Sequence, residues 1–162
     1  MKLRAALSAL VLLFATAALA SDASVAFDKL KTLEGSWAGK ASDGQAVQVS
    51  YRITSGGSAI MSEIQGHENM ISMFALDGDR LLITHYCAVG NQPRMAGTMS
   101  PDGKTFTFTF VDGTNILSSQ PGHMQRVTFA IIDANHHTEN WEFLTADGKQ
   151  EHHELFDLQR QK

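Results

Sequence analysis

The sequence predicts an all-β fold: an up-and-down antiparallel β-barrel of about ten strands, preceded by a short N-terminal helix. The first observation behind this prediction is a set of five Asp-Gly pairs, at positions 43–44, 77–78, 102–103, 112–113 and 147–148. Asp-Gly favours two-residue hairpin turns, because both central residues of such a turn take positive φ. The second observation is that apolar and polar residues alternate between most of these pairs, as they do in half-buried strands. A meander of this length is expected to close into a barrel, since closure removes exposed sheet edges.

The helix is predicted at residues 24–33, where apolar side chains fall at helical spacing. Asp22 or Ser24 supplies an N-cap, and Gly35 ends the segment. From there on the pattern keeps period two, and it predicts strands at 36–41, 46–54, 58–65, 68–76, 79–88, 93–100, 104–111, 123–133, 137–145 and 150–158. The segment 114–122 is the least regular and is expected to be a loop. No repeat or linker interrupts the strands, so residues 21–162 are expected to form a single domain.

The Asp-Gly turns also predict which residues face each other. Two-residue turns at 77–78, 102–103 and 147–148 pair Phe74 with Leu81, Met70 with His85, Glu68 with Cys87, Met99 with Phe106, Met95 with Phe110, and Trp141 with Glu154. These registers gather apolar residues from both strands on one face, as a barrel interior requires. The pair at 43–44 fits less well, because a two-residue loop there places Trp37 opposite Ser50 rather than Val49. That loop is therefore expected to be longer or bulged.

Residues 1–20 have the features of a secretory signal peptide. Lys2 and Arg4 form a basic start, residues 7–14 form a short apolar stretch, and Ala18-Leu19-Ala20 provides a small-x-small cleavage site. The apolar stretch is too short to span a bilayer comfortably. The sequence therefore predicts export to the periplasm or to the outside of the cell, with cleavage before Ser21 and no membrane attachment of the mature chain.

The mature chain is acidic. Without Lys2 and Arg4, 11 basic and 17 acidic residues remain, a formal charge of −6 with the histidines neutral. An acidic chain with no basic stripe argues against nucleic acid or an anionic membrane as the main partner. Cys87 is the single cysteine, so no intramolecular disulfide can form and the fold depends on burying a core. The oligomeric state stays open.

Several segments of the chain resemble known proteins. LEGSWAG (33–39) resembles the first strand of lipocalin-like (calycin) barrels, with its Gly-x-Trp, in which the Trp plugs the closed end of the barrel beneath the N-terminal segment. Secreted bacterial proteins of unknown function with a lipocalin-like barrel are similar in LDGDRL (76–81), THYC (84–87), GNQPRM (90–95), DANHHT (133–138) and Trp141. This resemblance covers nearly all of the mature chain and implies the fold, without an activity to transfer. A more distant similarity is to haem-binding nitrobindin-like barrels, although no histidine here can be matched to their proximal histidine.

Period two also predicts which polar side chains point into the barrel. Those that share a face with apolar neighbours are His85, Cys87, His137, Glu139, His152 and Glu154. Buried ionisable groups are costly unless paired, and they concentrate at functional sites. The candidate ligand-binding site also includes Glu68, Met70, Met95, Trp141 and, at the rim, Arg94, whose guanidinium can fork onto a carboxylate or phosphate. The same residues also fit a solvated barrel mouth or, for Cys87, a small buried apolar side chain.

The function that this pattern favours is binding of a small, largely apolar ligand in the lumen, without a cofactor. Methionine and aromatic side chains make an adaptable apolar wall, and those expected inside are Met70, Met95, Met99, Phe74, Phe106, Phe108, Phe110, Phe129, Trp141 and Phe143. The same side chains also fit a packed core without a cavity.

Two alternatives stay open beside the ligand carrier. One is a metal- or haem-binding barrel, for which His85, Cys87 and Glu68 are competent metal ligands. The other is an enzyme that uses an internal His–carboxylate pair as acid and base. No nucleophile elbow, phosphate-binding loop or cofactor fingerprint occurs in the sequence, so a non-enzymatic binding protein is favoured.

Overall fold

The computed structural model of the protein describes residues 22–66, 68–117, 119, 121–149 and 151–162. Within this part of the chain the all-β prediction is confirmed, since antiparallel strands follow one short helix. The elements are α1 (Asp22–Leu30), the 3₁₀ turn η1 (Lys31–Leu33), β1 (Gly35–Ala41), β2 (Ala46–Thr54), the 3₁₀ turn η2 (Ser55–Gly57), β3 (Ala59–Gln65), β4 (Met70–Asp77), β5 (Arg80–Tyr86), β6 (Gln92–Met99), β7 (Thr105–Thr114), β8 (Gly122–Asp133), β9 (His136–Thr145) and β10 (Glu151–Arg160).

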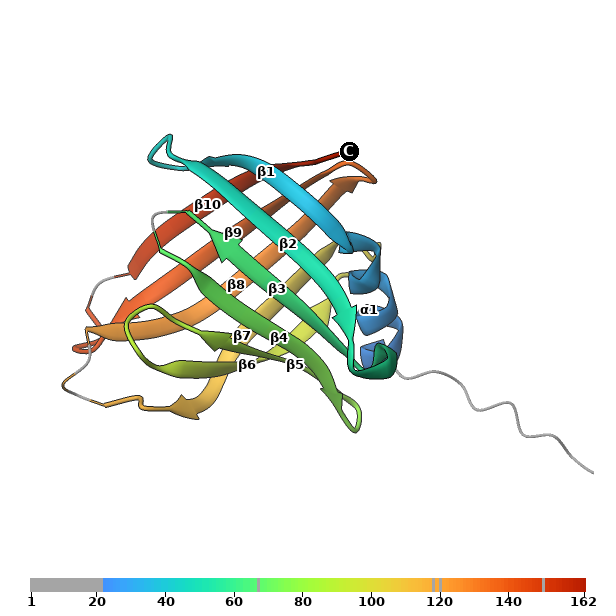
Figure 1. Ribbon diagram of the computed structural model, residues 1–162. Helices are drawn as coiled ribbons and strands as arrows, with labels where there is room; N and C mark the ends of the chain where they lie inside the picture. The colour runs from blue at the N-terminus through green and yellow to red at the C-terminus, as the bar shows by residue number, and fades with distance from the viewer. Residues whose placement is uncertain (1–21, 67, 118, 120, 150) are drawn as a thin grey trace, which may run out of the picture.

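The ten strands form one closed barrel (Figure 1). Each strand pairs with its neighbours in the chain, and β1 closes the barrel by pairing with β10, from Trp37 opposite Arg160 to Ala41 opposite Phe156. This is the up-and-down topology that the alternating pattern predicts. Closure gives every strand a hydrogen-bonded neighbour on both sides, so the barrel has no edge strand.

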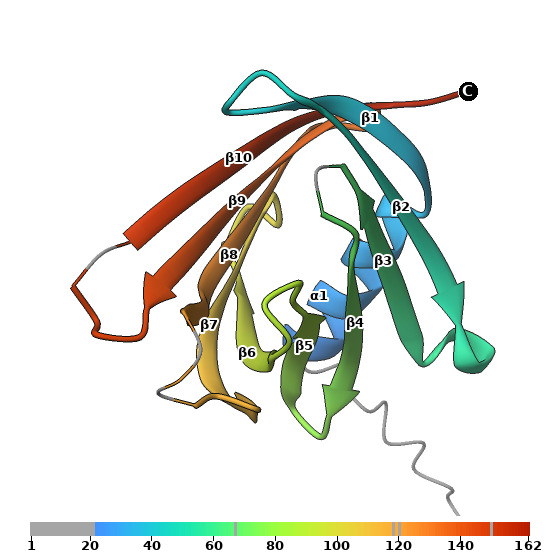
Figure 2. The ribbon, with the colours of Figure 1, turned by 60° about the vertical axis from the view of Figure 1, so that its left-hand side comes forward.

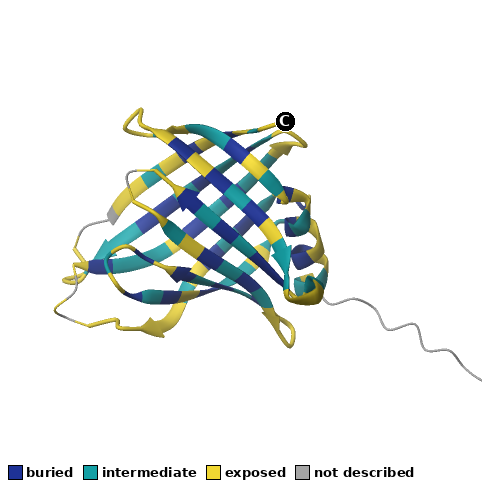
Figure 3. Cartoon of the chain, in the orientation of Figure 1, coloured by how far each residue is buried: buried dark blue, intermediate teal, exposed yellow. Residues whose placement is uncertain are grey.

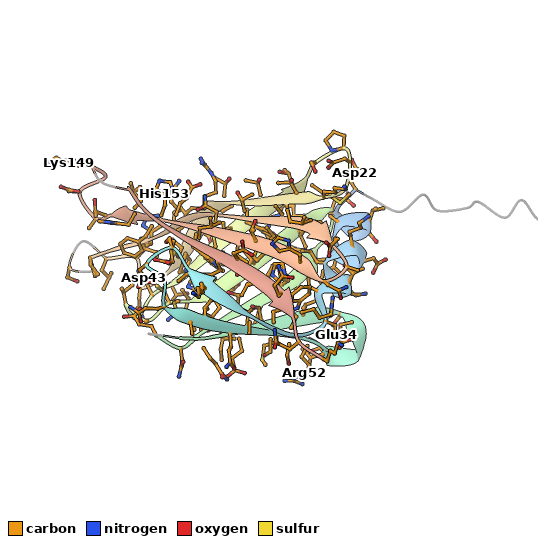
Figure 4. The ribbon with its side chains drawn as sticks, turned by 90° about the horizontal axis from the view of Figure 1, so that it is seen from above. Asp22, Glu34, Asp43, Arg52, Lys149 and His153 are labelled. Atoms are coloured by element: carbon orange, nitrogen blue, oxygen red, sulfur yellow. The ribbon has the colours of Figure 1, made fainter. Side chains whose placement is uncertain are left out.

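The helix lies across one end of the barrel (Figures 1 and 2). Ala26, Phe27 and Leu30 form the buried side of α1 and join the core. Gly35 then turns the chain into β1 with a φ of +126°, a conformation that L-residues with a side chain rarely adopt. The β1–β2 and β9–β10 loops lie at the opposite end, where Figure 4 labels Asp43 and Lys149. The barrel therefore has a helix-covered end and an end formed by hairpin loops.

Burial alternates along the strands, as Figure 3 shows. On β5, for example, Leu81, Ile83 and His85 are buried while Leu82 and Thr84 between them are less so. Of the apolar residues predicted inside, those fully in the core are Phe74, Met95, Phe106, Phe108, Phe129 and Trp141, while Met70, Met99 and Phe110 pack against it in part. Most of these side chains thus fill a solid core, and space for a ligand has to be sought at one end.

Three of the predicted turn geometries are confirmed. In the hairpin at 102–103 Met99 faces Phe106, and in the hairpin at 147–148 Trp141 faces Glu154. At the first hairpin Trp37 faces Val49. The Ala41 backbone N–H donates to the Gln45 carbonyl, which leaves a three-residue loop at 42–44. This loop is one residue longer than a two-residue turn, as the mismatch with Ser50 predicts.

Two expectations about Asp-Gly pairs are wrong. Asp77 is still in the ladder, paired with Arg80 by register and by an ion pair, so the loop is Gly78-Asp79. The predicted partners of β4 and β5 are therefore shifted by two, and the pairs Phe74–Leu81, Met70–His85 and Glu68–Cys87 do not form. His85 faces Ser72 instead. A shift of two keeps every side chain on the predicted face.

The pair at 112–113 is not a turn, because both residues lie inside β7, where Asp112 faces Arg94 and Gly113 faces Pro93. A side chain at Gly113 would collide with the backbone of β6, with a Cβ only 2.7 Å from the Gln92 carbonyl oxygen. The glycine here serves close strand packing rather than chain reversal.

The predicted signal peptide at residues 1–20 lies outside the described residues. Among the helices that the structure describes, none is both long and apolar enough to cross a membrane.

Candidate functional site

A row of polar side chains crosses four neighbouring strands on the inner face of the barrel. Tyr51 on β2, Ser62 on β3, Ser72 on β4 and His85 on β5 are successive partners in the strand registers. All four side chains are buried. Each is flanked along its strand by apolar inward residues, so the row is a polar layer inside an apolar lumen.

Glu139 on β9 is the hub of the buried polar contacts. Its carboxylate accepts hydrogen bonds from the Tyr51 hydroxyl (2.5 Å), the Trp141 indole N–H (3.0 Å) and His137 Nε2 (3.2 Å). Burial, and then the adjacent carboxylate, raise the pKa of Tyr51 well above its ordinary value, so the phenol stays protonated and donates. Buried carboxylates persist where donors surround them in this way. We call the row on β2 to β5, together with Glu139 and Trp141, the polar belt.

His85 is a member of the polar belt with only one of its two ring nitrogens in a hydrogen bond. Its Nδ1 lies 2.9 Å from Ser72 Oγ, and its ring lies against the Trp141 indole with 4.7 Å between centroids. Its Nε2 is buried and has no hydrogen-bond partner among the described residues. Burial lowers the pKa of His85 to about 4, so the imidazole is neutral at pH 7.

The buried neutral state of His85 predicts acid sensitivity. An unfolded chain takes up a proton at the ordinary pKa of 6.5, whereas the folded protein does so only near pH 4. The contribution of His85 to the free energy of unfolding is therefore fully present above about pH 6.5. It is lost as the pH falls to about 4, and the loss is about 3 kcal/mol. We expect wild type to lose about that much more stability than His85→Phe across this interval, measured by urea unfolding. Parallel pH profiles of the two proteins would contradict the prediction.

A pocket lies at the end of the barrel opposite α1, with a volume of about 240 Å³; Figure 4 labels Asp43, one of its rim residues. We call it the mouth pocket. Its apolar wall comes from five strands and consists of Val47, Ile64, Met70, Met124 and Phe156. Small and polar residues complete the lining: Ala41, Gln45, Ala46 and Gly66. The pocket is somewhat smaller than those of drug-sized ligands, which begin at about 300 Å³.

Three carboxylates, Asp43, Glu68 and Glu154, stand around the mouth pocket. No Lys, Arg or His occurs among the described residues that line it. Two of the carboxylates are held in place by the β1–β2 loop. Asp43 accepts from the Gln45 backbone and side-chain N–H groups at 2.9 and 2.7 Å, and Glu154 accepts from the Ser42 backbone N–H and hydroxyl at 3.0 and 2.9 Å. The rim therefore carries a negative potential that disfavours anionic guests.

The structure divides the predicted site residues into groups. Glu68, Met70 and Glu154 line the mouth pocket. Residues buried in the barrel and absent from its lining are His85, Cys87, Met95, His137, Glu139 and Trp141. The His–carboxylate pair expected of an enzyme exists as His137 and Glu139, but both side chains are fully buried and neither belongs to the pocket.

The remaining predicted residues lie elsewhere. Arg94 is exposed on the outer face of β6, where it forks onto Asp112 with two contacts of 2.6 Å, so its carboxylate partner is within the chain. His152 is exposed at the start of β10. Burial raises the pKa of Cys87, with Glu68 nearby, so the thiol is not activated. The structure gathers no group of three or more His, Cys, Asp or Glu side chains suited to a metal ion within its described part.

Sequence reasoning missed Tyr51, Ser62 and Ser72. Period two contained the signal, since Tyr51 shares a face with Val47 and Val49, and Ser62 lies between Ile60 and Ile64 on the inner face. The pocket residues of the β1–β2 loop had no such signal, because a loop has no period.

The class of protein that these features define is a closed ten-stranded antiparallel barrel with a small pocket at one end. Rv2717c from M. tuberculosis has a similar structure, with a TM-score of 0.61 and 16% identity over 85% of this chain and 98% of that one. A protein of unknown function of the DUF3598 family from Nostoc punctiforme gives a TM-score of 0.55 and 11% identity over 82% of this chain. This chain spans about half of that protein, at 49%. At these identities the likeness extends to the fold alone. No family profile matches the chain, and no curated protein matches it in sequence.

Proposed function

We propose that the protein is an exported, non-enzymatic binding protein of lipocalin-like type, which reversibly holds a small and largely apolar molecule in the mouth pocket. The observation that carries this proposal is the pocket itself: about 240 Å³ with a wall of Val47, Ile64, Met70, Met124 and Phe156. Ligand sites are concave, mostly apolar and supplied with a few polar groups that orient the guest. The mouth pocket has these properties.

The distribution of packing supports a carrier over an enzyme. The helix-covered half of the barrel is filled by aromatic side chains such as Phe74, Phe108 and Phe129, with ring centroids 5.6 to 5.8 Å apart. His137 and Glu139 lie within the filled region and are out of a guest's reach in this conformation. A guest in the mouth pocket therefore meets apolar surface and a carboxylate rim. Two pocket residues, Met70 and Met124, can adapt their shape to different guests.

Filling the mouth pocket is expected to expel the guest. Ala41 on β1 lines the pocket, so in Ala41→Phe a ring competes for the guest's space. Native mass spectrometry of protein isolated from the cells that make it is expected to detect a bound small molecule that is lost on denaturation. We expect its affinity to fall by at least about tenfold in Ala41→Phe, equivalent to about 1.4 kcal/mol.

Ala38→Phe is the matched control, because Ala38 lies on the same strand but alternates with the inward residues Trp37 and Gly39. This variant is expected to keep the guest. Isolation of the wild-type protein without any guest, or equal guest affinity in the two variants, would contradict the proposed function.

A further inference from the structure

One member of the polar belt has a hydrogen-bonding atom that faces no partner within the part of the chain described. This atom is Nε2 of His85, whose side chain is buried. An unsatisfied buried polar atom is costly, and native proteins retain few of them without a reason. His85 belongs to the inner-face row that crosses β3, β4 and β5. A partner for its Nε2 has to come from outside the chain.

The polar belt lies one layer below the mouth pocket. Ile64 and Met70 face each other across β3 and β4 and line the pocket, while Ser62 and Ser72 are the next facing pair with the same orientation. On the other wall, Glu154 lines the pocket and faces Trp141, the residue that lies against His85. A single layer of side chains, which includes Ile64 and Met70, therefore separates the mouth pocket from the polar belt.

Met70 is the adjustable part of this layer. It is only half-buried, and it packs against the edge of the core rather than within it. Methionine has an unbranched side chain with three rotatable bonds, so it can change rotamer at little cost. Displacement of Met70 would extend the mouth pocket toward Ser72 and His85.

We propose that the polar belt is the inner end of the ligand site, and that the guest of the mouth pocket carries a hydroxyl group that hydrogen-bonds to His85 Nε2 once Met70 moves aside. This inference rests on the proposed function and specifies its ligand class: an uncharged aliphatic or aromatic alcohol. The apolar part of the guest would remain against Val47 and Phe156, and its hydroxyl would point inward.

The chemistry of the belt selects a hydroxyl over other polar groups. The Ser72–His85 contact is compatible with either imidazole tautomer, so Nε2 is a donor in one and an acceptor in the other. A hydroxyl group both donates and accepts, and it satisfies Nε2 in both cases. A carboxylate finds no cation here, because His85 is neutral at pH 7 and the pocket rim is acidic.

Three eight-carbon probes test the proposal: 1-octanol, octanoate and n-octane, each added up to saturation. Methyl signals of Met70 and Met124 report occupancy of the mouth pocket, and the ring ¹⁵N shifts of His85 report contact with the belt. We expect 1-octanol and n-octane to move the methionine signals, 1-octanol alone to move the His85 nitrogens, and octanoate to bind much more weakly. His85→Phe is expected to weaken 1-octanol binding about fivefold to tenfold, the effect of one hydrogen bond, and to leave n-octane binding unchanged.

His123→Phe is the matched control. His123 also has a buried Nε2 without a partner in the described chain and lies against an aromatic ring, that of Phe110, but it lines a different surface hollow. This variant is expected to bind 1-octanol as wild type does.

The outcomes separate the two proposals. If 1-octanol occupies the pocket without moving the His85 nitrogens, or binds His85→Phe as tightly as wild type, or binds no better than octanoate, the inference is overturned and the pocket function stands. If neither n-octane nor 1-octanol moves the signals of Met70 and Met124, the proposed function itself fails. The wild-type spectra give this answer even if His85→Phe does not fold.

Discussion

Replacement of Glu139 by alanine is expected to lower the free energy of unfolding by about 3–5 kcal/mol. The carboxylate accepts from the Tyr51 hydroxyl, the Trp141 indole and His137, and all of these groups are buried. Alanine leaves the donors without a partner in a space closed to bulk water, and each buried unsatisfied donor costs about 1–3 kcal/mol. Urea unfolding at pH 7 measures the loss.

Two further variants show whether the loss comes from the hydrogen bonds. Glu139→Gln keeps the shape and one acceptor oxygen, so it is expected to lose less than the alanine variant. Glu63→Ala removes a glutamate from β3, next to the inward Ser62 but facing outward, and is expected to change stability by less than about 0.5 kcal/mol. A loss below about 1 kcal/mol in Glu139→Ala would mean that the hub is not a stabilising element.

The strands of the fold could be predicted from the sequence because period two is a local signal. Each strand needs only its own alternation to be recognised, and alternation also fixes the buried face. His85, His137 and Glu139 are buried as their neighbours predict. The register is less local. An Asp-Gly pair predicts the strand register correctly where the pair is the centre of the loop, as at 102–103. It predicts the wrong register at 77–78, where Asp77 still pairs with Arg80 in the ladder.

The candidate site was predictable only in part, because its contacts cross the barrel. The Tyr51–Glu139 hydrogen bond joins residues 88 positions apart on strands that are not neighbours. Alternation places both side chains inside, but it carries no information on their height along the barrel axis. Height is what separates Glu154, which lines the mouth pocket, from Glu139 in the sealed layer beneath it.

Local sequence patterns also explain why Arg94 and His152 were predicted at the site although neither lines the mouth pocket. Arg94 was predicted at the rim of the ligand site, but its side chain points outward, and both ends of its guanidinium bind Asp112. His152 lies on the inward-facing side of its strand by alternation, yet it is the second residue of β10, at the open end of the barrel, and it is exposed. Alternation predicts which face of the strand a side chain is on. Whether that side chain is exposed depends also on how near the residue lies to the end of the strand.

The scaffold and the site lie at opposite ends of the barrel, and Trp37 tests that separation. Trp37 is buried at the helix-covered end, where its indole N–H donates to the Leu33 carbonyl at 2.8 Å. Its ring system packs perpendicular to the His137 ring with 4.2 Å between centroids, and the Arg160 guanidinium lies over it, 4.1 Å from the ring centroid. Arg160 in turn donates to three backbone carbonyls, those of Thr32, Glu34 and Ala134.

Trp37→Ala is therefore expected to lower the free energy of unfolding by about 3–5 kcal/mol, the usual effect of removing a buried aromatic side chain. Amide hydrogen exchange should increase first in residues 31–35, which Trp37 and Arg160 hold against the barrel. Trp37→Phe keeps a ring under Arg160 and loses the N–H, so we expect a smaller loss of about 1–2 kcal/mol. Since no atom of Trp37 lines the mouth pocket, folded Trp37→Ala protein is expected to keep the guest affinity of wild type. Lost guest binding in a variant that is still folded would show that the two ends of the barrel are coupled and that the closed end is part of the site.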